Sequence, residues 1–286
     1  MKISSLFGKG RAVLSFEVFP PKKTSPVETI YSTLGELKEL EPDFISVTYG
    51  AGGNSADTTT CDIAAYITNE LKIPSAAHLT CVYSTKEDIL TRLAQLKERN
   101  VDNILALRGD VNPEIPRLHD FEYASDLTKF IKENGDFHVS GACYPECHLE
   151  SPSIVDDIQN LKFKLEAGAE HLMTQLFFDN TAFYNFYEKT QIAGINVPIE
   201  AGIMPVTNKK QIERMVSMCG ASLPAKFSKV MQKYENNPEA LRDAGIAYAV
   251  DQIVDLLSNG VQGIHLYTMN NPYVARKISE SVKNLL

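Results

Sequence analysis

The chain has 286 residues, of which 44% are hydrophobic and 22% charged, so its composition is that of a globular protein with length for one large core. A formal net charge of −8 argues against a surface that neutralises nucleic-acid phosphates. The first residues lack the apolar core of a signal peptide, and no run approaches the roughly 18 apolar residues of a membrane span. Five cysteines, an odd number, argue against a disulfide framework. We therefore expect a cytoplasmic protein that binds neither nucleic acid nor membranes.

Short β-rich runs alternate with helical segments along the chain. The centres of the first seven runs lie roughly 26 to 36 residues apart, which is the length of one strand–helix unit. The eight predicted strands are Val13–Phe19, Phe44–Tyr49, Ser75–Val82, Asn103–Arg108, His138–Tyr144, His171–Phe178, Pro198–Met204 and Gly263–Met269.

Helix-start signals lie between these strands. Ser25-Pro-Val-Glu28 and Ser84-Thr-Lys-Glu87 read as capping boxes, and Ser151-Pro152 opens a further helix that Gly168 ends. The interval before the last strand is about twice the usual length, so it predicts an additional helix there. Its helical candidates are Lys209–Cys219, Ala225–Asn236 and Pro238–Ser258.

About eight such units predict a closed (β/α)₈ barrel, with a doubly wound open sheet as the main rival. No Gly/Ser-rich linker or charged tail interrupts the pattern, so we expect a single domain over residues 1–286. The reactive groups of such a barrel lie at the carboxyl ends of the strands and in the loops that follow.

Two strand ends carry charged groups. Glu17 lies in an apolar strand, where partial burial would keep a carboxyl group protonated near neutral pH, as a general acid requires; pairing with an arginine is the structural alternative. Arg108-Gly109-Asp110 follows the fourth strand and suits a polar heterocycle or a phosphate, or else forms an internal ion pair. Polar or aromatic groups at most other strand ends favour a large ring-containing ligand.

Other motifs are weaker. Residues 50–55 nearly match a dinucleotide fingerprint, but Ser55 replaces the last glycine. Cys143, Cys147 and His148 lack further ligands at a recognisable zinc spacing, so we expect no metal. No H-x-H pair stands on the first strand and no strand holds an obvious Schiff-base lysine, which disfavours hydrolase and aldolase barrels.

Seven dispersed motifs, in order along nearly the whole chain, resemble those of methylenetetrahydrofolate reductases in their short bacterial form. They are Ser15-Phe-Glu17 with Phe19-Pro-Pro21, Val47-Thr-Tyr-Gly50, Ala77-His-Leu-Thr-Cys81, Ala106-Leu-Arg-Gly-Asp110, Tyr144-Pro-Glu146 with His148, Thr174-Gln175 with Phe178-Asp179, and Gly202-Ile-Met-Pro-Val206.

The resemblance implies a homo-oligomeric barrel that binds FAD non-covalently and passes a hydride from NADH or NADPH through the flavin to 5,10-methylenetetrahydrofolate in a ping-pong cycle. Glu17 matches the general acid of the family, and Asp110 an acidic catalytic group near flavin and pterin. The implied cofactor contacts are Tyr49, Ala51, His78, Arg108, Gly109, Asp110, Ala124, Tyr144, His148, Asp157, Asn160 and Lys164. The implied substrate contacts are Thr48, Gln175 and Gln211.

Three positions depart from the pattern of the family. Asn271 stands where relatives commonly have an arginine for the folate tail, so that Arg276 or Lys277 would have to substitute. Phe163 replaces a basic residue near the FAD phosphates, and Met215 replaces an aromatic residue facing the nicotinamide. The departures leave open an accessory electron-transfer subunit as donor. Two further alternatives are a flavin barrel resembling proline dehydrogenase and a non-catalytic subunit that holds FAD.

Overall fold

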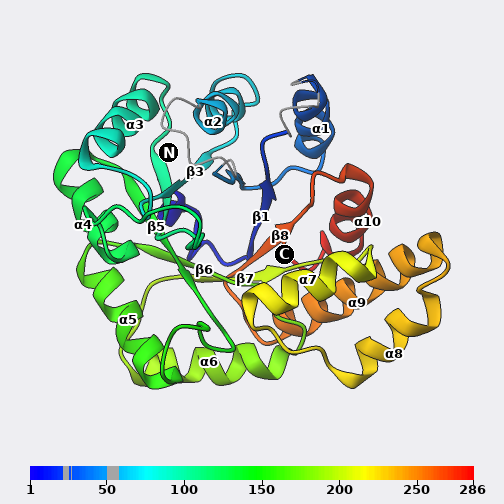
Figure 1. Ribbon diagram of the computed structural model, residues 1–286. Helices are drawn as coiled ribbons and strands as arrows, with labels where there is room; N and C mark the ends of the chain where they lie inside the picture. The colour runs from blue at the N-terminus through cyan, green and yellow to red at the C-terminus, as the bar shows by residue number, and fades with distance from the viewer. Residues whose placement is uncertain (22–25, 27, 50–57) are drawn as a thin grey trace.

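The computed structural model of the protein describes residues 1–21, 26, 28–49 and 58–286, without the side chain of Gln211. Eight parallel strands close into a barrel in chain order (Figure 1). The barrel fold predicted from the sequence is therefore confirmed, and the open sheet is excluded. The strands are β1 (Val13–Val18), β2 (Phe44–Val47), β3 (Ser75–Thr80), β4 (Asn103–Leu107), β5 (His138–Cys143), β6 (His171–Thr174), β7 (Ile199–Ile203) and β8 (Gly263–Tyr267).

All eight strands end earlier than the sequence predicts, and β6 differs most. Its predicted end is Phe178, but the strand stops at Thr174. The chain then turns, because the Leu176 N–H donates to Oε1 of Gln175 at 2.8 Å instead of to a neighbouring strand. Phe177 and Phe178 are buried in this loop, where each stacks on another phenylalanine. The apolar run was mistaken for strand because a buried loop and a buried strand select similar residues.

A layer of helices surrounds the barrel (Figure 1). Three helices fill the long interval between β7 and β8, at the three places where the sequence predicts helical segments, although α8 ends at Tyr234 and not at Asn236. The helices are α1 (Glu28–Lys38), α2 (Thr59–Asn69), α3 (Lys86–Glu98), α4 (Ala124–Asn134), α5 (Ile154–Glu166), α6 (Asn180–Ile192), α7 (Lys209–Cys219), α8 (Ala225–Tyr234), α9 (Pro238–Ser258) and α10 (Pro272–Val282).

Two helix caps differ from the sequence prediction. The capping box of α3 is formed by Thr85 and Asp88, not by Ser84 and Glu87, because the Ser84 hydroxyl donates to the Thr80 carbonyl at 3.0 Å. Helix α5 is capped by Ser153, whereas the Ser151 hydroxyl donates to the buried Asp157. The box predicted over residues 25–28 lies mostly outside the described residues.

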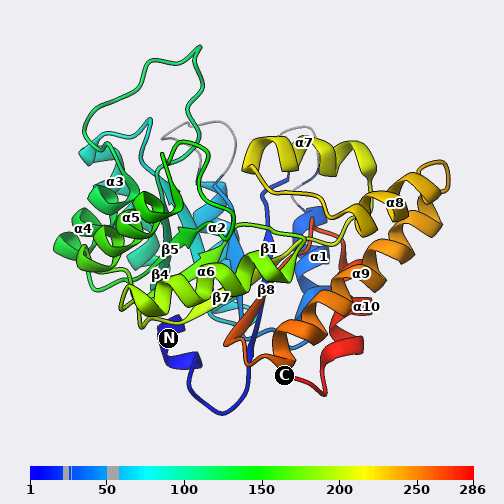
Figure 2. The same cartoon turned by 90° about the horizontal axis from the view of Figure 1, so that it is seen from below.

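The two ends of the barrel are built differently. A short 3₁₀ helix, η1 (Ile3–Leu6), closes the amino end, where the Ile3 N–H donates to Asn103 Oδ1 at 2.9 Å over an apolar layer that includes Phe44 and Leu105. Figure 2 shows α7 and the long loop between β4 and α4 at the opposite end, away from both termini. Among the described residues, no helix is long and apolar enough to cross a membrane.

Candidate active site

Polar side chains fill much of the barrel interior, from the first residues of β6 and β7 to the carboxyl end of β1. Successive residues of a strand point to opposite faces, so every second residue faces inward. Ser15 and Glu17 of β1 both face inward, and Leu14, Phe16 and Val18 pack outward against the helices. The inward face also carries Ser46, His78, Ser140, His171, Glu200 and His265 from six other strands.

The Glu17 carboxyl group lies between two imidazole rings at the carboxyl end of β1. Its Oε2 is 3.6 Å from Nε2 of His78 and 3.8 Å from Nε2 of His265, and its side chain is 20% exposed. Burial lowers the pKa of His78 to about 4, so this ring is neutral at pH 7. Among the described residues, no arginine lies within ion-pair distance of Glu17, so the structural alternative of an arginine partner is wrong.

A buried chain of polar contacts extends from His265 to the other side of the barrel. Ser15 Oγ lies 2.6 Å from His265 Nδ1 and donates to Glu200 Oε1 at 2.9 Å. Glu200 Oε2 lies 3.1 Å from His171 Nε2, and His171 Nδ1 lies 3.0 Å from Ser140 Oγ. His171, Glu200 and His265 were not predicted as site residues from the sequence, although polar side chains at every second position of their strands are the signal that could have found them.

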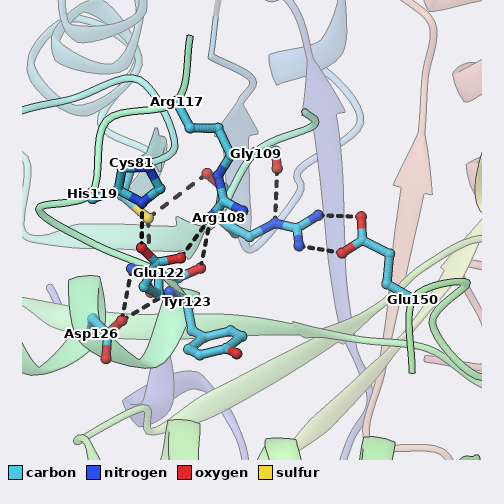
Figure 3. A network of polar contacts seen from close by, with 9 residues as sticks. All are labelled: Cys81, Arg108, Gly109, Arg117, His119, Glu122, Tyr123, Asp126 and Glu150. Carbon is cyan, nitrogen blue, oxygen red and sulfur yellow. Dashed lines mark hydrogen bonds and ion pairs between the residues drawn. The ribbon is translucent and has the colours of Figure 1, made fainter. Parts of the chain in front are cut away.

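The Arg108-Gly109-Asp110 segment leaves β4 as expected. Gly109 has φ +89°, and a Cβ there would lie 3.1 Å from Val82 Cγ1, so the position requires glycine on both grounds. The Arg108 guanidinium forms two hydrogen bonds, of 2.5 and 2.8 Å, to the carboxylate of Glu150 (Figure 3). This contact holds the pKa of Glu150 below its usual range. The ion pair of this segment is thus with Glu150, while Asp110 is exposed.

Polar contacts anchor the loop that joins β4 to α4 beside Arg108 (Figure 3). Arg117 and His119 both contact the carboxylate of Glu122, at 3.2 and 2.6 Å. The Tyr123 N–H donates to Asp126 at 2.9 Å, which starts α4 at Ala124, a predicted cofactor contact. The start of α4 is therefore held near the exit of β4, where Cys81 contacts both the Arg108 and Tyr123 carbonyls.

Tyr144 and His148 lie together after β5. Their rings meet edge to face, with centroids 4.6 Å apart and planes at 88°. The His148 N–H donates to Asp157, and Nδ1 of His148 accepts from the Glu150 N–H at 3.1 Å, so Nε2 carries the proton of the neutral ring.

Three predicted cofactor contacts lie on α5, and two of them form hydrogen bonds with other groups of the protein. Asp157 accepts from the His148 N–H and the Ser151 hydroxyl, so both of its oxygens support the loop that carries His148. Lys164 donates to the Ala142 carbonyl of β5 at 2.8 Å, and burial lowers the pKa of its ammonium group. Asn160 is exposed.

The predicted substrate contacts fall into two groups. Thr48 and Gln175 are half-buried directly after β2 and β6, whereas the side chain of Gln211 lies outside the described residues. Of the predicted cofactor contacts, Tyr49 follows Thr48, and Ala51 lies outside the described residues. The assignments of Gln211 and Ala51 therefore stay predictions.

The Gly202 motif of β7 has a packing explanation. A Cβ on Gly202 would lie 2.4 Å from the Thr174 carbonyl oxygen and 2.8 Å from the Tyr267 ring. Tyr267 donates its hydroxyl to that same carbonyl at 2.7 Å, which fixes β6 against β8 across the barrel end. The glycine therefore permits a close approach of protein groups to one another.

The structure also shows where the residues that depart from the family pattern lie. Asn271 caps α10 by accepting from the Val274 N–H at 3.2 Å, and Arg276 pairs at 2.7 Å with Glu39, which directly follows α1 in the outer helix layer. Phe163 is 49% exposed on α5. Met215 lines a small pocket between α7 and residues 204–208, together with Met269.

Fold and site together define a (β/α)₈ barrel with a carboxyl group between two imidazole rings at the end of the first strand. The sequence profile described as methylenetetrahydrofolate reductase matches residues 2–283, and the chain belongs to that family of oxidoreductases.

Two bacterial relatives cover nearly the whole chain. The 5,10-methylenetetrahydrofolate reductase of Pectobacterium carotovorum subsp. carotovorum is 36% identical over 96% of this chain and 91% of its own length. That of Escherichia coli K12 is 34% identical over 96% and 92%. The methylenetetrahydrofolate reductase (NADH) 1 of Arabidopsis thaliana is 35% identical over 94% of this chain but only 48% of its own length.

A solved structure supports the fold alone. An uncharacterized protein from Clostridium thermocellum, described as binding two copies of 5-methyl-5,6,7,8-tetrahydrofolic acid, has a TM-score of 0.67, with 16% identity over 96% of both chains.

Proposed function

We propose that this chain, as a single domain, reduces 5,10-methylenetetrahydrofolate to 5-methyltetrahydrofolate, with FAD as its cofactor and NADH or NADPH as electron donor. The observation that carries the proposal is the Glu17 carboxyl group, 20% exposed at the carboxyl end of β1 and flanked by two imidazole rings. Family membership supports the substrate, because the relatives of similar length are named for it.

Glu17 acts as the general acid. Its carboxyl group donates a proton to a ring nitrogen of the bound folate, and the bond from the bridging carbon to that nitrogen breaks with its electron pair moving to the nitrogen. The bridging carbon is left as an electrophilic iminium that accepts a hydride. Two features suit Glu17 to this role. Its side chain is 20% exposed at the carboxyl end of β1, where a bound ligand can reach it, and the neighbouring His78 ring is neutral.

The residues at the ends of β4 and β5 fit FAD. Arg108 offers a cation for its phosphates, Gly109 allows a close backbone approach, and Tyr144 and His148 offer aromatic surfaces. When bound there, FAD supplies the hydride-transfer chemistry. Asp110, exposed beside this region, then places a negative charge near the rings of flavin and folate.

The electron donor is tested separately from the folate reaction. The names of the plant relatives support NADH as donor. We therefore expect NADH to bleach the flavin absorbance of the purified holoenzyme in a stopped-flow instrument. Reduction by dithionite but not by NADH or NADPH would instead favour an accessory electron-transfer subunit.

The folate reaction decides the proposed function. Holoenzyme reduced with dithionite and mixed with 5,10-methylenetetrahydrofolate under anaerobic conditions should regain its flavin absorbance and yield 5-methyltetrahydrofolate, identified by mass spectrometry. Proline and its oxidised product serve as the comparison substrates for a proline-dehydrogenase-like barrel. Failure of the folate to reoxidise the flavin would overturn the proposal.

A further inference from the structure

The proposed chemistry does not use the most deeply buried carboxyl group of the barrel interior. Glu200 of β7 has no exposed surface, and burial raises its pKa to about 7. Its neighbours are the Ser15 hydroxyl and the rings of His171 and His265, with the charge of Asp43 further away. Burying a carboxyl group is costly, so a specific contact must offset the cost.

The Ser15 hydroxyl determines the direction of the hydrogen bonds. It carries one proton but lies against two close acceptors, Glu200 Oε1 at 2.9 Å and His265 Nδ1 at 2.6 Å, and one distant acceptor, the Ile264 carbonyl at 3.5 Å. If Ser15 donates to Glu200, then Nδ1 of His265 must carry a proton and donate to Ser15 Oγ. The tautomer of His265 therefore depends on whether Glu200 Oε1 is an acceptor.

His171 determines the role of that oxygen. Burial lowers the pKa of His171 to about 3, so the ring is neutral, with Nε2 3.1 Å from Glu200 Oε2. Both atoms are buried without a hydrogen-bond partner, and a single proton placed between them would satisfy both. A proton held on the Oε2 side leaves Oε1 as an acceptor, which draws the Ser15 proton away from His265.

The consequence appears at Glu17. With its proton on Nδ1, His265 presents the lone pair of Nε2 to Ser46 Oγ at 3.4 Å and to Glu17 Oε2 at 3.8 Å. A lone pair aimed at a carboxyl group favours the protonated form, whereas an N–H aimed at it favours the carboxylate. The other groups facing Glu17 are His78 of β3 and Tyr267 of β8, and the Tyr267 hydroxyl already donates to Thr174.

We propose that Glu200 is a positioning residue which, through Ser15, fixes His265 as the Nδ1–H tautomer, so that the ring presents the lone pair of Nε2, and not an N–H, to the Glu17 carboxyl group that the folate reaction uses. This inference rests on the proposed function for its kinetic consequence. Its structural half, the tautomer of His265, is independent of any substrate.

Two variants of Glu200 separate positioning from packing. In Glu200→Gln, the amide oxygen can accept from Ser15 and the amide group can donate to His171, so the direction of the chain is kept. Glu200→Leu has a similar volume but no acceptor, so Ser15 is free to donate to Nδ1 of His265 and the ring proton moves to Nε2. Ser15→Ala is the second test of the chain, and Met173→Leu, also buried in the barrel, is the packing control.

The tautomer is measured by ¹⁵N NMR on holoenzyme with labelled histidines, with His265→Gln providing the assignment. We expect protonated Nδ1 in the wild type, Glu200→Gln and Met173→Leu, and protonated Nε2 in Glu200→Leu. A protonated Nε2 in the wild type, or the same tautomer in Glu200→Leu as in the wild type, would overturn the inference whether or not folate is the substrate.

The kinetic readout is the pH profile of flavin reoxidation by 5,10-methylenetetrahydrofolate. The midpoint of its alkaline limb should fall by about one pH unit in Glu200→Leu and Ser15→Ala, which slows the reaction about tenfold above the midpoint. Glu200→Gln should keep the wild-type profile, and donor-dependent reduction should stay unchanged in all variants. An unshifted midpoint, or an equal loss in both half-reactions, would show that Glu200 is only structural. Wild-type enzyme that folate does not reoxidise would overturn the proposed function instead.

Discussion

The β1–β8 side of the barrel end and its β4–β5 side hold their charged groups in different ways. Around Glu17, the supporting groups His265, Ser15 and Glu200 are fully buried and linked by hydrogen bonds. Around Arg108, the main contact is an ion pair with Glu150, whose side chain is 57% exposed. A buried network cannot rearrange without leaving polar groups unpaired, whereas an exposed ion pair breaks at little cost. The acid side is thus preorganised, and the proposed cofactor side can adjust to a ligand.

Among the variants of the preorganised side, Glu17→Gln should have the largest effect on the reaction rate. Because the amide cannot donate a proton as an acid does, reoxidation of the flavin by folate should slow about 10³-fold. Reduction by the nicotinamide should change less than about threefold, since it needs no acid at that position. Stopped-flow absorbance measures both half-reactions, and Glu39→Gln, at an exposed position just after α1, is the matched control. Equal loss in both would show that Glu17 acts only on structure.

The second effect is on stability at acid pH. Burial lowers the pKa values of His78 and His138 to about 4 and that of His171 to about 3, so these rings are neutral in the folded chain. Above the histidine pKa of the unfolded chain, 6.5, the rings are neutral in both states and the free energy of unfolding is at its full value. As the pH falls from 6.5 toward about 4, the unfolded chain takes up protons that the folded chain does not, so the free energy of unfolding decreases. Each ring is worth about 3 kcal/mol over that window. Glu200, whose pKa is raised to about 7, acts in the opposite direction between pH 4.5 and 7.

Urea unfolding followed by circular dichroism at pH 7 and pH 5 checks this effect. The free energy of unfolding should be lower at pH 5. The difference between the free energies of unfolding at pH 7 and pH 5 should be smaller in His138→Gln, because one buried histidine fewer takes up a proton on unfolding. His119→Gln, at an exposed position, should leave that difference unchanged. A pH-independent free energy of unfolding would contradict the burial of neutral histidines.

On the adjustable side, Arg108→Ala should weaken FAD binding by about 10- to 100-fold, the usual cost of one charge-assisted contact. Flavin fluorescence during titration of the apoprotein measures the affinity. Arg276 of α10 also pairs with a glutamate, so Arg276→Ala is the control and should leave the affinity for FAD unchanged. An unchanged affinity in Arg108→Ala would place the flavin phosphates elsewhere.

The smallest expected effect is an increase in the affinity for FAD. Glu150 competes with an anionic ligand for the Arg108 guanidinium, so Glu150→Gln should tighten FAD binding by a few-fold, about 0.5 kcal/mol for a partly exposed pair. The same fluorescence titration detects it, with Glu122→Gln in the neighbouring loop as the control. Weaker binding in Glu150→Gln would mean that the ion pair orients Arg108 for the cofactor.

The strands were predictable because burial imposes a strong pattern on the residues of a parallel sheet. All eight begin at or beside the predicted residue, yet β6 ends at Thr174 since Phe177 and Phe178 are buried in a loop that the pattern cannot distinguish from strand. The α3 cap shifted by one residue because the Ser84 hydroxyl donates to the carbonyl of Thr80, the last residue of the preceding strand. In the first case tertiary burial misled the strand pattern, and in the second a competing local contact overrode the capping signal.

By itself, the sequence determined the order and spacing of the strands, the glycine at 109, and the position of Glu17 and Arg108 at strand ends, since these depend on local pattern and on motifs. The tertiary structure alone decided which polar groups meet. Ser15 and Glu200 are 185 residues apart, and Ser15 and His265 are 250 apart. Only barrel closure and the register of β1 with β8 and of β8 with β7 bring them within hydrogen-bonding distance. The physical reason is that the alternation along each strand decides which side chains face the interior, whereas the closure of the barrel decides which of these side chains contact each other.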